Sequence, residues 1–273
     1  MWIVSAAVLA LAVILVSLFA IRLSRDKPTT YRQEKQRPVS IPYAPAKGGT
    51  VALIIDDMGH SRSAALPFLE MDVPLALSFL PGRPHSVQLA EEGFARGKSI
   101  LLHLPMEPKG YPRINPGKGV VLISHDSGEI RRILREDLRS VPHAIGINNH
   151  MGSLATENER VMTDVLEFAR DERLLFIDSR TSPRSVAYRI AKDLNVSSAE
   201  RDIFLDNERD EDAIYARVTE LLDLAEARGW AIGIGHPYPE TAKVLKRAAA
   251  DAERRGILWV SLQEMVRYVD PGN

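Results

Sequence analysis

Two adjacent acids, Asp56 and Asp57, follow an unbroken run of five apolar residues at positions 51–55. Such a run is typical of a strand that is buried on both faces of a parallel sheet. Carboxylates at the carboxyl end of that strand lie where parallel α/β folds place their chemistry. Ionised side by side they repel each other, and a cation or a shared proton would relieve the repulsion. On this stretch alone, an acid that caps the next helix beside a solvated acid explains the pair equally well.

Three histidines, His103, His150 and His236, also follow predicted apolar strands. Parallel strands gather their carboxyl ends at one rim, so we expect these imidazoles to lie near the acid pair. Neutral imidazoles with a carboxylate form the ligand set of a catalytic zinc or a similar divalent ion with an open coordination position. The chain has no cysteine, which excludes disulfides, thiolate metal sites and cysteine nucleophiles. Taken singly, each histidine is more simply explained as a hydrogen-bonded residue at a strand end.

Other polar residues at strand ends have open roles. Glu107 lies four residues after His103 and is a candidate second ligand or the partner of a ligand. The amides of Asn148 and Asn149 could orient substrate or ligands, or be solvated loop groups. Asp178 is a candidate ligand or partner of a ligand, with a helix cap as the alternative, and Arg180 is a candidate substrate-binding residue, with a structural carboxylate pair as the alternative. Asp206 is interpreted as a helix cap, and Thr156 as the start of a capping box that opens a helix.

The elements that must position these residues alternate between strand and helix. From residue 51 onward the pattern predicts strands near the following residues: 51–55, 75–80, 99–102, 144–148, 174–177, 202–205, 230–234 and 257–260. We detect no internal repeat. A distorted (β/α) barrel of about seven to eight parallel strands explains this pattern best, and an open doubly wound sheet is the competing fold. The size of the region favours the barrel.

The amino-terminal part of the chain differs from the rest. Residues 2–21 carry no charge and only two polar side chains, Ser5 and Ser17, and about 20 apolar residues suffice for a helix to span a bilayer. No signal-peptide cleavage site is evident, so we predict a membrane anchor. Residues 22–49 have the composition of a flexible linker, and residues 50–270 form the predicted barrel domain.

Charge is unevenly spread along the chain. Residues 22–47 hold seven Lys and Arg against two acids, a local charge of +5; with a net charge of −1, the rest carries −6. This balance argues against a nucleic-acid-binding body. Basic residues that directly follow the anchor favour a cytoplasmic domain by the positive-inside rule.

Five motifs occur in the order of a known family: Ile-Ile-Asp56-Asp57-Met-Gly, Leu-His103-Leu-Pro-Met-Glu107-Pro, Gly-Ile-Asn148-Asn149-His150-Met-Gly-Ser, Asp178-Ser-Arg180-Thr and Ile-Gly-His236-Pro. Over about residues 50–268 the chain resembles the divergent polysaccharide deacetylases, a distant branch of the NodB-type carbohydrate esterases. That resemblance implies a distorted barrel that uses a divalent metal to remove N- or O-acetyl groups from sugars.

The resemblance also implies roles for single residues. Asp56 is the expected base, Asp57 and His103 are expected ligands, and His236 is the expected general acid. The NodB-type enzymes have a second ligand histidine where this chain has Glu107, and an Arg-x-Pro-Tyr motif where it has Asn148-Asn149-His150. His150 is therefore the candidate replacement for the missing ligand.

The leading hypothesis from the sequence is a membrane-anchored, metal-dependent deacetylase that acts on an acetylated envelope carbohydrate. We expect zinc as the metal and a domain that faces the periplasm or the cell exterior, because the family resemblance and the linker outweigh the charge bias. One alternative is a catalytically silent barrel that binds glycan or a partner protein in the envelope. Another is a cytoplasm-facing enzyme for a small acylated metabolite, which follows if the charge rule holds.

Overall fold

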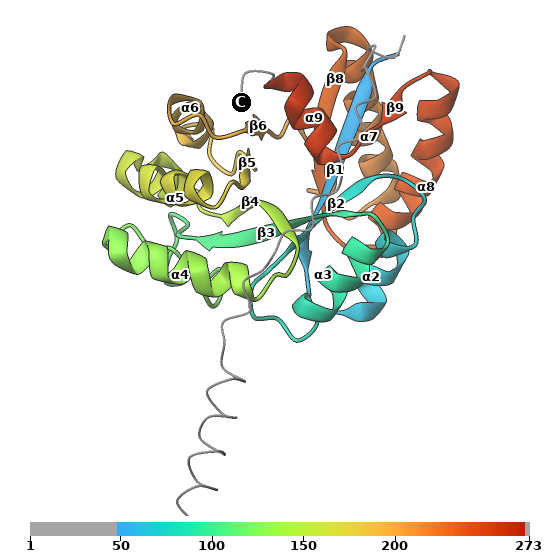
Figure 1. Ribbon diagram of the computed structural model, residues 1–273. Helices are drawn as coiled ribbons and strands as arrows, with labels where there is room; N and C mark the ends of the chain where they lie inside the picture. The colour runs from blue at the N-terminus through green and yellow to red at the C-terminus, as the bar shows by residue number, and fades with distance from the viewer. Residues whose placement is uncertain (1–47, 271–273) are drawn as a thin grey trace, which may run out of the picture. The chain divides into compact units, whose positions relative to one another are not determined.

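A curled sheet of parallel strands forms the centre of residues 48–270, which are the residues that the computed structural model describes (Figure 1). The strands are β1 (Thr50–Met58), β2 (Leu75–Phe79), β3 (Ser99–Met106), β4 (Ala144–Met151), β5 (Leu175–Asp178), β6 (Ser198–Glu200), β7 (Ile203–Phe204), β8 (Trp230–Gly235) and β9 (Leu258–Trp259). Eight of them form one hydrogen-bonded path in the order β6-β5-β4-β3-β2-β1-β8-β7, and β9 pairs with the start of β1. The prediction of seven to eight parallel strands in a barrel-like sheet is confirmed.

The first strand is the centre of this sheet. β1 pairs with β8 through residues 50–55 and with β2 from Leu53 onward. Its apolar run is at most 1% exposed to solvent, as expected for a strand that is covered on both faces. Burial of branched apolar side chains therefore fixes the position of the acid pair that follows.

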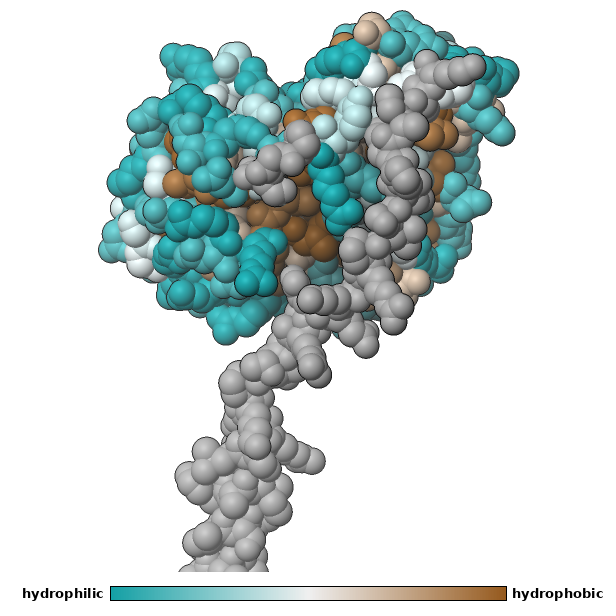
Figure 2. Space-filling view, turned by 45° about the horizontal axis from the view of Figure 1, so that its top comes forward, coloured by the Kyte–Doolittle hydropathy of each residue, from teal (hydrophilic) through white to brown (hydrophobic). Residues whose placement is uncertain are grey.

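Helices and one 3-10 turn connect the strands. They are α2 (Arg62–Leu69), α3 (Ser86–Ala95), α4 (Ser127–Arg139), the 3-10 turn η1 (Ala155–Glu157), α5 (Glu159–Asp171), α6 (Ala187–Asp193), α7 (Glu211–Arg228), α8 (Pro239–Arg254) and α9 (Leu262–Val269). Figure 1 shows them around the outside of the sheet. Amphipathic helices such as α4 bury an apolar stripe that includes Ile130 and Leu134. The described surface in Figure 2 is mostly hydrophilic on its outer parts, with hydrophobic residues gathered toward the centre of the view.

One segment of chain forms both ends of the strand order. The start of residues 197–205 pairs with β5, where the amide of Arg201 donates to Asp178. The end of the segment pairs with β8, where the amides of Asp202 and Leu205 donate to carbonyl groups of that strand. Consecutive parts of one segment thus join the two edges of the curled sheet.

Two local predictions need correction. Thr156 does not open a helix, because its hydroxyl donates to the carbonyl of Gly152 inside the η1 region. The cap of α5 is instead Asn158, whose side chain accepts from the amide of Val161. The predicted cap at Asp206 is also wrong, since this carboxylate binds a histidine, as described below.

The predicted anchor, residues 2–21, lies outside the described residues, as does all of the predicted linker except its last two positions. Among the helices of residues 48–270, none combines the length and the apolar character that a membrane span requires. The anchor therefore stays a prediction.

Candidate metal and catalytic site

The acid pair turns toward the strand-end rim because the backbone leaves strand geometry at Asp57. Consecutive side chains of a regular strand point to opposite faces of the sheet. Asp57, however, has a φ of 56°, a left-handed conformation that Asp and Asn adopt more readily than other side chains. The register between β1 and β2 also shifts between Ile55 and Met58. As a result, both carboxylates approach Nε2 of His103, Asp56 to 3.6 Å and Asp57 to 3.3 Å.

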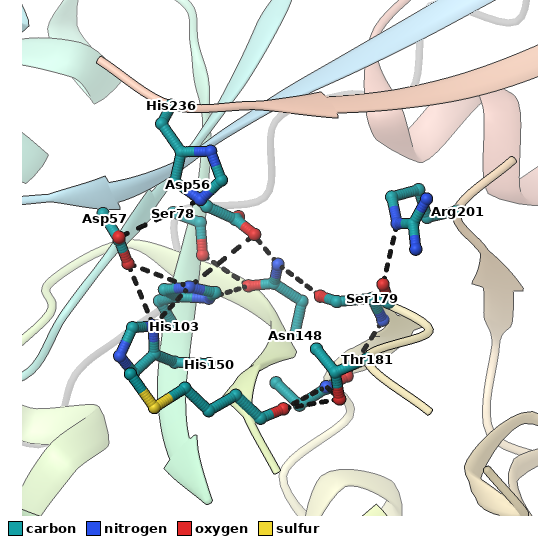
Figure 3. Close-up of polar contacts among 12 residues, drawn as sticks. Asp56, Asp57, Ser78, His103, Asn148, His150, Ser179, Thr181, Arg201 and His236 are labelled. Atoms are coloured by element: carbon teal, nitrogen blue, oxygen red, sulfur yellow. Dashed lines mark hydrogen bonds and ion pairs between the residues drawn. The ribbon is translucent and has the colours of Figure 1, made fainter. Parts of the chain in front are cut away.

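Three donor atoms form the centre of the site, which we call the triad: Oδ1 of Asp57, Nε2 of His103 and Nδ1 of His150. The distance from Asp57 Oδ1 is 3.3 Å to the His103 nitrogen and 2.9 Å to the His150 nitrogen. The two nitrogen atoms lie 3.2 Å apart. Figure 3 shows the three side chains, from β1, β3 and β4, pointing toward one another.

The triad has the geometry and chemistry of a divalent-metal site. Zinc bonds of about 2.0–2.2 Å place neighbouring ligand atoms roughly 3–3.5 Å apart in a tetrahedral site, which matches the three observed separations. Oδ1 of Asp57 is buried and has no hydrogen-bond partner despite its short contacts with the imidazoles. Buried polar atoms are nearly always hydrogen-bonded, so this oxygen is placed as a metal ligand would be. The residues therefore fit a divalent cation.

His236 faces the triad from β8. Its Nε2 lies 3.9 Å from Oδ2 of Asp57. Its Nδ1 lies 2.9 Å from Oδ1 of Asp206, a buried carboxylate whose other oxygen accepts from the His236 amide at 2.6 Å and from the Thr241 hydroxyl at 2.7 Å. Asp206 therefore fixes the ring and directs Nε2 toward the rim.

A buried amide lies beneath the triad. Asn148 is 0% exposed, and its Oδ1 lies 3.0 Å from Nδ1 of His103. Its Nδ2 donates to Oδ1 of Asp56 at 2.8 Å and to the Ser179 hydroxyl at 3.1 Å. The hydroxyl of Ser78 donates to Oδ1 of Asn148 (Figure 3).

The environment shifts the pKa values of the two carboxylates in opposite directions. Burial raises the pKa of Asp56, and the charges of His103 and His236 offset only part of that rise. Burial alone would also raise the pKa of Asp57, but the adjacent imidazoles of His103 and His150 hold it well below its usual range. Two neighbouring acids therefore differ in basicity, which is a common arrangement for groups with different tasks.

The pKa values of the three histidines are also shifted in different directions. Burial opposes protonation of His103, but the charges of Asp56 and Asp57 raise its pKa to about 8. Burial lowers the pKa of His236, but the hydrogen bond with Asp206 together with the charges of Asp56, Asp206 and Asp57 raises it above the usual value. Burial lowers the pKa of His150.

The remaining predicted site residues hold the surrounding loops. Glu107 is not part of the triad, because its Oε2 accepts from the amide of Ile123 at 2.6 Å. The side chain of Asn149 accepts from the Ser179 amide at 2.9 Å and donates to the Met151 carbonyl at 2.9 Å. These bonds tie the loop after β5 to the end of β4.

Two further candidates flank that loop. Asp178 is fully buried and accepts from the amide of Arg180 at 2.8 Å and from the hydroxyl of Ser185 at 2.6 Å. The guanidinium of Arg180 pairs with Glu200 at 2.7 Å. Asp178 is therefore not part of the triad and does not cap α6, whose N-cap is Val186. Both residues stabilise the β5–β6 region at the edge of the site.

Sequence reasoning gave no role to two residues of the site and the wrong role to a third. Asp206 was recognised as an acid at a strand end but was interpreted as a helix cap, whereas it binds His236. Ser78, within β2, and Ser179, after β5, carry no signal in the sequence that sets them apart from other serines.

The comparisons with known proteins agree with this architecture. The curled sheet of parallel strands is NodB-like. The family model described as divergent polysaccharide deacetylase matches residues 53–266, and the chain therefore belongs to that family. The resemblance seen in the sequence motifs is confirmed.

Individual relatives extend the comparison. The chain is 35% identical over 204 residues to YibQ, an uncharacterised protein of Escherichia coli strain K12; the match covers 75% of this chain and 63% of that protein, less than two thirds of its length. An uncharacterised Agrobacterium tumefaciens C58 protein of known structure is 25% identical, with a TM-score of 0.77 over 82% of this chain and 92% of that one. A CE4-family pseudoenzyme from Bacillus anthracis has a TM-score of 0.50 at 16% identity, over 80% of this chain and 65% of that one, and this likeness concerns the fold alone.

Proposed function

We propose that this chain is a divalent-metal-dependent hydrolase that removes an acetyl group from an acetylated carbohydrate of the cell envelope. The triad carries the proposal, since its three donor atoms lie 2.9–3.3 Å apart at the rim of the sheet. A carboxylate and a histidine outside the triad face it from either side. Membership of the deacetylase family supports the acyl-carbohydrate substrate.

Hydrolysis of an amide needs a group that takes a proton from water and a group that gives one to the leaving amine. Asp56 suits the first task, because burial raises its pKa and thereby makes the ionised form a stronger base. Its Oδ2 lies 3.6 Å from His103 Nε2 and so faces the triad. A bound divalent cation would polarise the acyl carbonyl and lower the pKa of water.

His236 suits the second task. Asp206 holds its Nδ1 at 2.9 Å, and the carboxylates of Asp206, Asp56 and Asp57 together raise the pKa of the ring above its usual value despite burial. The remaining proton-bearing atom, Nε2, faces the triad. A ring held in this way presents its proton to the nitrogen of the departing amine.

The membrane location of the substrate is part of the proposal. The apolar residues 2–21 would anchor the chain, and the linker would let the domain reach a polymer next to the membrane. The wider partners of the protein are carbohydrate and membrane, with no nucleic acid.

The test combines metal analysis with acetate release. We expect the full chain, purified in detergent and dialysed, to retain about one divalent ion, most simply zinc, as in sites with three protein ligands. Asp56→Asn and His236→Ala should each lower acetate release from acetylated chito-oligosaccharides or peptidoglycan fragments by about 10²–10⁴-fold. The melting temperature of Asp56→Asn should not fall, because the amide avoids the cost of a buried charge. His236→Ala should lower the melting temperature, because it leaves the buried carboxylate of Asp206 without its imidazole partner. His143→Ala, away from the rim, is the control.

Two results would contradict this function. The metal assignment fails if a His103→Ala/His150→Ala double variant retains the ion. The hydrolase assignment fails if metal-loaded wild-type protein releases no acetate from a broad substrate panel. In that case, a catalytically silent barrel that binds glycan becomes the better explanation.

A further inference from the structure

The side chain of Asn148 uses all of its hydrogen-bonding capacity inside the site. An asparagine amide offers two donors and an oxygen with two lone pairs. Here the oxygen faces Ser78 and His103, and the nitrogen faces Asp56 and Ser179. The residue is 0% exposed, so it cannot turn toward solvent or substrate without breaking these contacts.

The orientation of this amide follows from its partners. Asp56 acting as a base must be ionised, and an ionised carboxylate only accepts hydrogen bonds. The Asn148 atom that lies 2.8 Å from Asp56 is therefore the nitrogen. The other end is the oxygen, which lies 3.0 Å from Nδ1 of His103 and accepts its proton.

The hydrogen bond between His103 Nδ1 and Asn148 Oδ1 determines which His103 nitrogen carries the lone pair. A neutral imidazole carries one proton, and a ring that donates from Nδ1 has its lone pair on Nε2. Nε2 is the atom that lies 3.3 Å from Asp57 and 3.2 Å from the ring of His150. The lone pair therefore points at the centre of the triad.

We infer that Asn148 is a positioning residue that couples the two halves of the site: its oxygen sets His103 as a ligand through Nε2, and its nitrogen holds Asp56 as the base. Partners of this kind commonly fix the tautomer of a ligand histidine. The inference rests on the proposed function for its catalytic half, whereas the tautomer of His103 can be measured without metal or substrate.

Two substitutions separate the two roles. Asn148→Asp retains an oxygen toward His103 but places a second carboxylate against Asp56, and two carboxylates at that distance must share a proton. We expect metal affinity within about threefold of wild type and a loss of acetate release of at least about a hundredfold. Asn148→Leu removes both contacts and should also lower metal affinity by about 10–100-fold.

The third measurement is the tautomer itself. In the metal-free full chain, at a pH that leaves the ring neutral, ¹⁵N chemical shifts should show His103 protonated at Nδ1. In Asn148→Leu the Nε2–H form should become populated. If the Leu variant does not fold, the wild-type tautomer and the Asn148→Asp variant still decide the question.

Asn158→Asp is the matched control, since Asn158 caps α5 away from the site and Asp caps a helix equally well. Its metal affinity and activity should equal those of wild type. Any one of three results would overturn the inference. They are an Nε2–H tautomer of His103 in wild type, full activity in Asn148→Asp, and unchanged metal affinity in a folded Asn148→Leu. If wild type binds no metal and releases no acetate while His103 is protonated at Nδ1, the proposed function fails and the positioning contact stands.

Discussion

At the scale of single residues, Asp137 is a buried carboxylate outside the candidate site. It lies on α4, is 7% exposed, and its Oδ2 has no hydrogen-bond partner. It packs so tightly against Gly119 that a Cβ on this glycine would lie 2.3 Å from Oδ1. Burial, with a smaller contribution from the charge of Glu136, raises the pKa of Asp137 to about 8.

This residue predicts a pH dependence of stability. Because the pKa of Asp137 is higher in the folded chain than in the unfolded chain, the folded state binds the proton more tightly. Stability should therefore fall as the pH rises from about 4 to about 8, and then level off. Asp137→Asn removes the titration, so its advantage in unfolding free energy over wild type should grow across that range to a few kcal/mol. Thermal unfolding of both proteins between pH 5 and pH 9 measures this, and parallel profiles would contradict it.

The sequence predicted the identity of the site residues better than their roles. The acid pair, His103, His150 and His236 were found because each follows an apolar run and parallel strands end at one rim. The strand-end rule does not show that Asp57 adopts a left-handed conformation, which is what brings its carboxylate to the same side as that of Asp56. The burial of Asn148 depends on partners 31 and 70 residues away, Ser179 and Ser78, so nothing local could reveal it.

At the scale of elements, the joined edges of the sheet depend on Arg201. Its Nε donates to the carbonyl of Ser179 at 2.7 Å and its Nη2 to that of Arg180 at 3.1 Å. The guanidinium also lies over the ring of Phe204 at 5.2 Å. Arg201 thus connects the loop after β5 to the segment that continues into β7 by two hydrogen bonds.

We predict that Arg201→Met destabilises the domain. The substitution retains most of the apolar stem but leaves two carbonyl groups without their charged donor, and hydrogen bonds to charged groups contribute about 1.5–3 kcal/mol each. Urea unfolding should show a loss of about 2–4 kcal/mol, below the sum because the group is partly exposed. Arg254→Met, which removes an exposed partner of Asp251, is the control and should cost less than about 1 kcal/mol. Equal losses in the two variants would contradict a special role for Arg201.

The strands themselves were predictable where they contain an apolar run. The apolar runs of β1, β2, β4 and β8 indicated those strands, and the two-residue strands β7 and β9 lie inside the predicted strands 202–205 and 257–260. The three-residue strand β6 was not predicted, because Ser198–Glu200 has no apolar run. The helix cap predicted at Thr156 is wrong because this residue lies within the 3-10 turn that precedes α5. The parts of this fold that the sequence does not predict are therefore β6 and the 3-10 turn η1.

At the scale of the whole molecule, the orientation in the membrane is a prediction from sequence alone. We expect residues 2–21 to remain attached and residues 49–273 to face the periplasm or the cell exterior, against the basic residues that follow the anchor. Alkaline phosphatase fused after residue 48 should be active, and a fluorescent protein that folds only in the cytoplasm should be dark at the same site. The same fusions without residues 2–21 are the control. A fluorescent fusion with inactive phosphatase would contradict the orientation.

The segment of residues 197–205 has a consequence for how copies of this protein meet one another. An edge strand exposes unpaired backbone amides and carbonyls, and a long one is a template for aggregation. Within residues 48–270, the outermost strands of the path are β6 and β7, and they are consecutive parts of this single short segment. Neither presents a row of backbone groups long enough for another chain to extend. We therefore expect that domains at high local concentration do not aggregate by pairing their edge strands.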